Sequence, residues 1–213
     1  MRLRVCLQAV PVTCGLVTVI AVLTSCSPTN TKVSASPGSV MVSPNSTLLI
    51  TPIAELSEKE SVTLMDWAAH EITLEGSDLT TPNYWDVAYR SQLAGIQLPR
   101  YDSFDTTTFN TLQANLDVNF VLLTRLEKLN ENNNNELSNP DYQRREAIVS
   151  MKLIDLERKI VVWHCTARVS ANPLKANGKT QQYSINILSG SYAVSKAFKE
   201  SIRRLRKSLV IKK

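Results

Sequence analysis

Two pairs of side chains have the types and spacing that catalysis or metal binding could use. Asp66 and His70 are four positions apart on an expected helix and could share one face, but two ligands do not make a zinc site without a third. His164 and Cys165 resemble a base and its nucleophile, yet adjacent residues of a strand point to opposite faces. We therefore expect no catalytic residue and no metal site from either pair.

Motifs for phosphate binding and acyl transfer are missing from the sequence. It has six glycines and contains no G-x-x-x-x-G-K-[ST], G-x-G-x-x-G or G-x-S-x-G pattern. With nineteen acidic residues, the sequence leaves open the possibility of a catalytic pair of carboxylates, although no spacing identifies a particular pair. We expect no cofactor and no nucleic-acid partner.

The first 25 residues are typical of a lipoprotein signal peptide. Two arginines near the start precede an apolar run over 15–23, which at about 14 Å is too short to cross a bilayer core of roughly 30 Å. The run ends in Leu23-Thr24-Ser25-Cys26, which resembles the lipobox of bacterial lipoproteins. The resemblance implies cleavage between Ser25 and Cys26, and fatty acyl chains such as palmitate on Cys26. The alternative is a chance cysteine near an ordinary signal cleavage site.

Lipidation of Cys26 would make it a membrane anchor. Each buried CH₂ contributes about 0.8 kcal/mol and a single chain binds only marginally, so several chains are needed for stable anchoring. Ser27 suggests the outer membrane, since in enterobacterial lipoproteins an Asp at that position favours inner-membrane retention. Cys6 and Cys14 would leave with the signal, and Cys165, in an apolar run, is expected to be an inert buried thiol.

The chain after the signal divides into a tether and one domain. Residues 27–46 contain six serines, three prolines and one charge, a composition typical of a flexible linker. We therefore predict a signal peptide over 1–25, a lipidated cysteine with a tether over 26–46, and a single domain over 47–213.

The first half of this domain is expected to be a strand followed by helices. The strand covers 47–53, and Ser57 with Glu60 forms a capping-box pattern before the first helix. A second helix is expected to begin at Thr81-Pro82, and a third at 106–108. Trp85, Tyr89 and Ile96 follow the expected start of the second helix. We expect the three tryptophans of the chain to lie in the core: Trp67, Trp85 and Trp163.

The second half is expected to be strands closed by a long helix. A central strand over 118–126 precedes a hairpin of strands over 147–156 and 160–169, and residues 182–188 could add an edge strand. A helix over 189–210 has one apolar stripe. The predicted fold class is α+β: a small, largely antiparallel sheet with helices packed on it and an amphipathic C-terminal helix.

The positive charge of the chain concentrates in that last helix. Residues 196–213 contain eight basic residues and one acidic residue. Anionic lipid headgroups or an acidic partner could bind this surface, and an ordinary solvated helix face is the alternative. The cations in question are Lys196, Lys199, Arg203, Arg206 and Lys207.

Three segments resemble small envelope lipoproteins. Residues 112–126 are similar to a helix and the strand that follows it in those proteins, and residues 193–209 are similar to their closing helix. Residues 151–169 are similar to their hairpin, with Leu153, Asp155 and Trp163 in corresponding places. The family includes the penicillin-binding-protein activator LpoB, the TolB amino-terminal domain and the curli export lipoprotein CsgG. In the hairpin turn, Glu157-Arg158 replaces the usual Thr-Gly. The resemblance implies the fold and transfers no functional residue.

The expected function is therefore a non-enzymatic one. We expect a lipoprotein anchored through Cys26 in the bacterial outer membrane, with its domain facing the periplasm and binding another envelope protein or joining an assembly. Two alternatives stay open at this point: an envelope hydrolase or glycan-binding enzyme that uses carboxylates, and a subunit of an export or surface apparatus.

Overall fold

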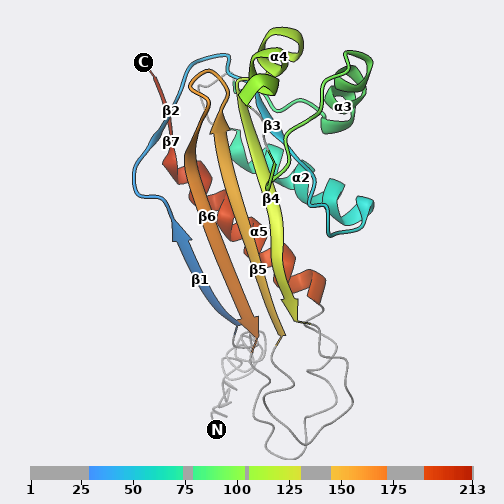
Figure 1. The fold of residues 1–213 in the computed structure, drawn as a ribbon. Helices are drawn as coiled ribbons and strands as arrows, with labels where there is room; N and C mark the ends of the chain where they lie inside the picture. Colours follow the sequence, from blue (N-terminus) through green and yellow to red (C-terminus); the bar gives the residue numbers. More distant parts are fainter. Residues whose placement is uncertain (1–28, 74–78, 104–105, 131–144, 172–189, 213) are drawn as a thin grey trace, which may run out of the picture.

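A five-stranded sheet in the order β1-β6-β5-β4-β3 organises the fold (Figure 1). The computed structural model describes residues 29–73, 79–103, 106–130, 145–171 and 190–212. The strands of the sheet are β1 (Thr29–Ala35), β3 (Leu48–Ile50), β4 (Phe120–Asn130), β5 (Arg145–Asp155) and β6 (Ile160–Ala171). Among the described pairings within this sheet, only that of β3 with β4 is parallel, so the largely antiparallel α+β fold is confirmed.

The β5–β6 hairpin forms as its alternating pattern predicts. Val149 of β5 and Ala167 of β6 are paired and fully buried, and the same face is buried from Ala147 to Leu153 and from Trp163 to Val169. Next to the turn the register shifts between Leu153 and Ile154, and Val161 is 40% exposed instead of sharing the buried face. In the turn, Lys159 adopts a positive φ of 59°, and Asp155 Oδ1 accepts a hydrogen bond from Arg158 N–H at 3.0 Å. The aspartate thus stabilises the connection in place of the Thr-Gly turn that the resemblance implies.

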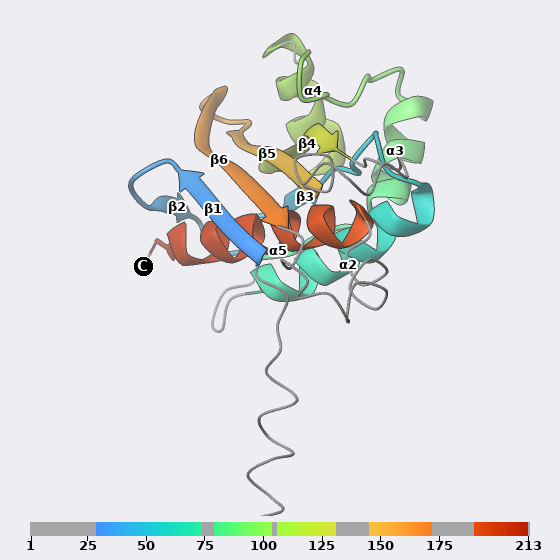
Figure 2. The same cartoon turned by 90° about the horizontal axis from the view of Figure 1, so that it is seen from below.

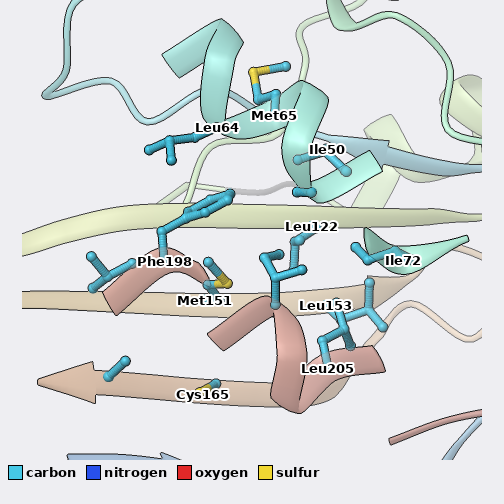
Figure 3. Close-up of a cluster of buried hydrophobic side chains, with 14 of the residues drawn as sticks. Ile50, Leu64, Met65, Ile72, Leu122, Met151, Leu153, Cys165, Phe198 and Leu205 are labelled. Carbon is cyan, nitrogen blue, oxygen red and sulfur yellow. The ribbon is translucent and has the colours of Figure 1, made fainter. Parts of the chain in front are cut away.

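Helices cover both faces of the sheet, but to different extents. Figure 2 shows α5 (Gly190–Ser208) and α2 (Glu58–Ile72) beneath the sheet and α4 (Thr106–Leu116) on the opposite side, with α3 (Tyr84–Leu93) beside it. The larger core lies under α5 and α2, where Phe198 and Leu205 contact the sheet near Met151 and Leu153 (Figure 3). A smaller core, with Phe109 of α4, covers only part of the other face.

The starts of α2 and α3 show how side chains set helix boundaries. Ser57 and Glu60 form the predicted capping box, in which the Ser57 hydroxyl accepts from Glu60 N–H. The α3 helix begins at Tyr84 rather than at the predicted Thr81-Pro82, because the Asn83 side chain accepts from Trp85 N–H at 2.8 Å and acts as the cap.

The prediction of a flexible tether over residues 27–46 is wrong for residues 29–46. Residues 29–35 form β1, which pairs with β6 over its whole length. Val40 and Val42 belong to β2 (Val40–Val42) and are buried in the larger core. Serine-rich composition does not prevent this, because an edge strand needs only one half-buried face and the ladder supplies its hydrogen bonds. The folded domain therefore begins by Thr29 rather than at 47.

The C-terminal helix also ends earlier than predicted. It stops at Ser208 instead of residue 210, and Leu209–Ile211 form β7, which pairs in parallel with β2. This pairing brings residue 40 beside residue 209. The predicted edge strand over 182–188 lies outside the described residues.

The assignment of β2 to the core can be tested by a pair of neighbouring substitutions. Val42→Ala removes two methyl groups from a side chain that is 2% exposed and should lower the free energy of unfolding by about 2 kcal/mol. Met41→Ala, at a side chain that is 52% exposed, should change it by less than about 0.5 kcal/mol. Urea denaturation measures both. If both substitutions changed the free energy of unfolding by less than about 0.5 kcal/mol, residues 40–42 would be a linker.

Candidate functional site

Three of the five predicted surface cations connect α5 to α2. Lys199 Nζ lies 5.2 Å and the guanidinium carbon of Arg203 lies 5.7 Å from the centroid of the Trp67 ring. Arg206 donates to Glu71 Oε1 at 3.1 Å. Contacts of this kind stabilise a helix pair, each by about 0.5–1 kcal/mol for a cation over an exposed ring. This part of the basic face is therefore also a helix–helix contact.

The other two cations lie apart from this contact. Lys196 donates to Thr29 Oγ1 of β1, and Lys207 is exposed near the end of α5. Eleven residues of helix place them about 16 Å apart along the axis. The five cations thus form an extended line rather than one compact anion site. Binding of a partner or of lipid headgroups by this line stays a prediction.

The two residue pairs considered for chemistry lie in unrelated surroundings. His164 is exposed and its Nδ1 lies 2.5 Å from Ser36 Oγ, whereas Cys165 is buried on the opposite face. Burial raises the pKa of the Cys165 thiol, although a hydrogen bond with Ser201 acts in the other direction. Asp66 and His70 are exposed on α2, and the described residues contain no group of three or more possible metal ligands.

A polar network crosses β4, β5 and β6 on the face away from α5. Ser150 Oγ donates to Glu127 Oε1 at 2.5 Å and lies 3.0 Å from Thr166 Oγ1. Arg125 pairs with Glu127 at 3.5 Å and with Asp102 at 2.5 Å. The sequence did not indicate this network, because its members come together only through the register of three strands.

Tyr101 completes the network between two cations. Its ring centroid lies 4.8 Å from the Arg125 guanidinium carbon and 4.2 Å from Lys152 Nζ. Burial raises the pKa of Tyr101, so its hydroxyl stays protonated at neutral pH. Ser150 donates to a carboxylate rather than to a histidine, and a serine nucleophile needs an adjacent base. We interpret the network as a cross-strand connection.

The outer face of α3 carries a stripe of large apolar side chains. Trp85, Tyr89 and Leu93 are 44%, 65% and 71% exposed, and their spacing of four residues places them on one side of the helix. We call these three residues the α3 stripe. Exposed apolar side chains are unremarkable singly, but a contiguous set of them marks an interaction surface.

The prediction that Trp85 lies in the core is wrong, and Tyr89 is also outside it. The buried residues of α3 are Val87 and Ser91, so the helix presents its smaller side chains to the protein interior, where Val87 joins the smaller core. Of the other two tryptophans, Trp163 is buried as predicted and Trp67 is only partly buried. The sequence carries no signal for this orientation, because a helix usually turns its larger apolar side chains toward the core.

A cleft of about 220 Å³ lies beside the α3 stripe, between α2 and the start of α3. Met65 and Asp66 of α2 line one side, and Tyr84 and Trp85 line the other. The two aromatic rings meet edge to face, with centroids 5.1 Å apart. Burial raises the pKa of Tyr84, opposed by the nearby Arg100. Small-molecule sites usually exceed 300 Å³, so this cleft is smaller than most of them.

Comparisons with known proteins find similar structures but no family. No protein-family model matches the chain, and no curated protein matches it. The PelC dodecamer from Paraburkholderia phytofirmans is 11% identical with a TM-score of 0.44, and the match covers 83% of this chain and 98% of that chain. Lipoprotein GNA1162 from Neisseria meningitidis is 14% identical with a TM-score of 0.41, covering 62% and 88%.

The family that the sequence resembles is represented among these structures. The LpoB C-terminal domain from Salmonella enterica is 15% identical with a TM-score of 0.40, and the match covers 60% of this chain and 84% of that chain. All three TM-scores lie below 0.5.

The contributions of Trp67 and of Trp85 in the α3 stripe to the stability of the domain can be compared with a matched pair of variants. Trp67→Ala removes a partly buried ring and two cation contacts, so it should lower the free energy of unfolding by about 2 kcal/mol. Trp85→Ala should cost less than about 1 kcal/mol, because nearly half of that side chain is exposed. Thermal and urea unfolding measure the difference, and a larger cost for Trp85→Ala would contradict this assignment.

Proposed function

We propose that the chain is an outer-membrane lipoprotein, anchored through Cys26, whose domain faces the periplasm and binds another envelope protein without catalysing a reaction. The observation that carries the binding role is the α3 stripe. Trp85, Tyr89 and Leu93 leave a large apolar area in water, although the same helix has small buried residues on its other side. Aromatic residues exposed in this way are typical anchors of protein interfaces.

The cleft next to the stripe supports a protein partner. The cleft is smaller than most small-molecule sites, and it is continuous with Trp85 of the stripe. A partner could therefore place one side chain in the cleft, and the partner residues around that side chain could cover Tyr89 and Leu93. Interfaces commonly combine a central pocket with a surrounding apolar area.

The start of β1 restricts where binding can occur. Thr29 is three residues after Cys26, and three extended residues span about 10 Å at most. A lipid anchor on Cys26 would hold the first folded residue within about that distance of the leaflet. The partner would then be a protein of the same membrane or one that approaches its surface. None of the described helices is long and apolar enough to cross a membrane.

The contacts of the carboxylates on the outer face of the sheet support a role of that face without catalysis. Asp102 and Glu127, the acidic residues of the outer network, both pair with Arg125. Glu146, which is buried, pairs with Arg168. Glycoside hydrolysis requires two carboxyl groups on either side of an open substrate site, and these carboxylates instead join neighbouring strands or a strand and a loop.

The anchor can be tested by labelling cells with radioactive palmitate. Label should enter the wild-type chain and the Cys6→Ala variant, because Cys6 leaves with the signal peptide. It should not enter Cys26→Ala, which lacks the thiol that receives the lipid. Globomycin, which inhibits lipoprotein signal cleavage, should leave a larger labelled precursor. Unlabelled wild type, or labelled Cys26→Ala, would refute the anchor.

The binding surface can be tested by a photoreactive amino acid placed at single positions in the living cell. At Tyr89 it should give a discrete adduct with one envelope protein, and at the exposed Lys159 of the hairpin turn it should not. Leu93→Asp should reduce the Tyr89 adduct at least tenfold, because it places a charge in an apolar interface, while leaving thermal unfolding unchanged. Adducts of equal yield at both positions would mean that the α3 stripe is not the interface.

A further inference from the structure

The cleft between α2 and the start of α3 has an apolar base and a charged opening. Ile50 and Met65 line it and are buried, so they form its base (Figure 3). Asp66 and Trp85 also line it and are exposed, so they lie at its opening. Of the described residues around the cleft, only Asp66 carries a charge. This combination suits a side chain with an apolar stem and a cationic end.

The Asp66 carboxylate has no partner in the part of the chain that the structure describes. It makes no hydrogen bond and no ion pair with those residues, whereas Glu71 of the same helix pairs with Arg206. The cation that acts on Tyr84 is Arg100, which opposes the rise in the pKa of that phenol but does not line the cleft. The negative charge at the opening can therefore pair with a cation that a partner brings.

The Trp85 ring lacks the cations that two other rings of the chain have. Tyr101 and Trp67 each have two cationic groups of the chain within 6 Å of the ring centroid. Trp85 is nearly half exposed and meets the edge of Tyr84, and no cation from the described residues lies over it. A guanidinium can stack on such a ring and at the same time donate hydrogen bonds to a carboxylate.

The part of the chain around the cleft is acidic, although the whole chain is basic. Residues 47–103, which include α2 and α3, contain nine acidic and three basic residues, whereas the formal net charge of the chain is +5. Residues 74–78, which follow α2, contribute two of the acidic residues and no basic one. A region with such an excess of negative charge steers positively charged partners toward it.

We propose that the cleft binds an arginine side chain from a basic segment of the partner protein. The stem of the arginine lies on Ile50 and Met65, and its guanidinium stacks on Trp85 and donates to the Asp66 carboxylate. The proposal rests on the proposed function, because the partner that covers the α3 stripe supplies this arginine. It assigns that partner a chemistry: apolar side chains for the stripe, next to a basic residue for the cleft.

A peptide titration tests whether the cleft binds this cation. The protein is purified from membranes in a non-ionic detergent with isotope-labelled tryptophan indoles, and the probe is the capped peptide acetyl-Gly-Arg-Gly-amide. The same peptide with citrulline is the control, because citrulline has the shape of arginine without its charge. The arginine peptide should shift the Trp85 indole signal saturably and leave that of the buried Trp163 unchanged. The citrulline peptide should bind about fivefold more weakly.

A matched pair of variants tests the role of Asp66. Asp66→Asn keeps the shape of the side chain and removes its charge, so it should weaken binding of the arginine peptide about threefold. Asp86→Asn removes an exposed charge from the same acidic region, next to Trp85, but Asp86 does not line the cleft. At physiological salt it should change binding by less than about 1.5-fold. Equal effects of the two variants would indicate general attraction by the acidic region and would overturn the proposal.

The photoreactive amino acid at Tyr89 extends the test to the partner in the cell. Asp66→Lys places a positive charge at the opening of the cleft and should reduce the Tyr89 adduct about tenfold. Asp86→Lys, the matched control, should reduce it less than about twofold. An adduct with the mass of two copies of this chain would mean that a second copy supplies the arginine, and would overturn the assignment to another envelope protein.

The results distinguish the cleft from the proposed function of the stripe. No adduct at Tyr89 in the wild type would refute the binding role of the stripe, and the titration would still decide whether the cleft binds arginine. An adduct that persists in Asp66→Lys, together with equal binding of the arginine and citrulline peptides, would overturn the role of the cleft and leave the stripe as the interface. If Asp66→Lys fails to fold, the comparison of the two peptides on the wild type decides.

Discussion

The packing of α5 across β4, β5 and β6 positions most of the other elements. Phe198, Ile202 and Leu205 are completely buried on the sheet, and burying side chains of this size contributes about 1.5–3 kcal/mol each. The same helix contacts α2 through Lys199 and Arg203, which lie over Trp67. It also contacts β1 through Lys196 and continues directly into β7. One amphipathic helix therefore contacts a neighbouring helix, the edge strand β1 and the small second sheet.

Where the sequence has a regular apolar period, the structure follows it. The hairpin alternates every second residue and α5 has an apolar stripe, so both were predictable from the pattern alone. The β1 segment was not, because its inward residues are Thr29, Thr31, Val33 and Ala35, which are small or polar. A half-buried edge strand accepts such residues since its stability comes largely from backbone pairing with β6. Composition alone does not distinguish this situation from a linker.

The α3 helix shows a different limit of sequence analysis. Periodicity reveals that Trp85 and Tyr89 share a face, but it does not say whether that face meets the core or the solvent. Val87 packs in the smaller core together with Phe109 and Leu112 of α4, and Trp85 and Tyr89 consequently lie on the solvent side of the helix. The outer network around Tyr101 was unpredictable for a related reason: Arg125 and Lys152 approach the same ring only because β4 and β5 pair in their observed register.

The parallel pairing of β2 with β7 has a consequence for how the chain reaches its final structure. Val40 and Leu209, which are partners in this pair, are separated by almost the whole length of the domain. Contacts between such distant positions form late, since a long loop must close first. A chain that emerges amino end first can therefore form its early elements, but β2 has no strand partner until residues 209–211 have emerged. Completion of this small sheet is thereby linked to the synthesis of β7, and a polypeptide truncated before Leu209 would leave the apolar side chains of Val40 and Val42 without that partner.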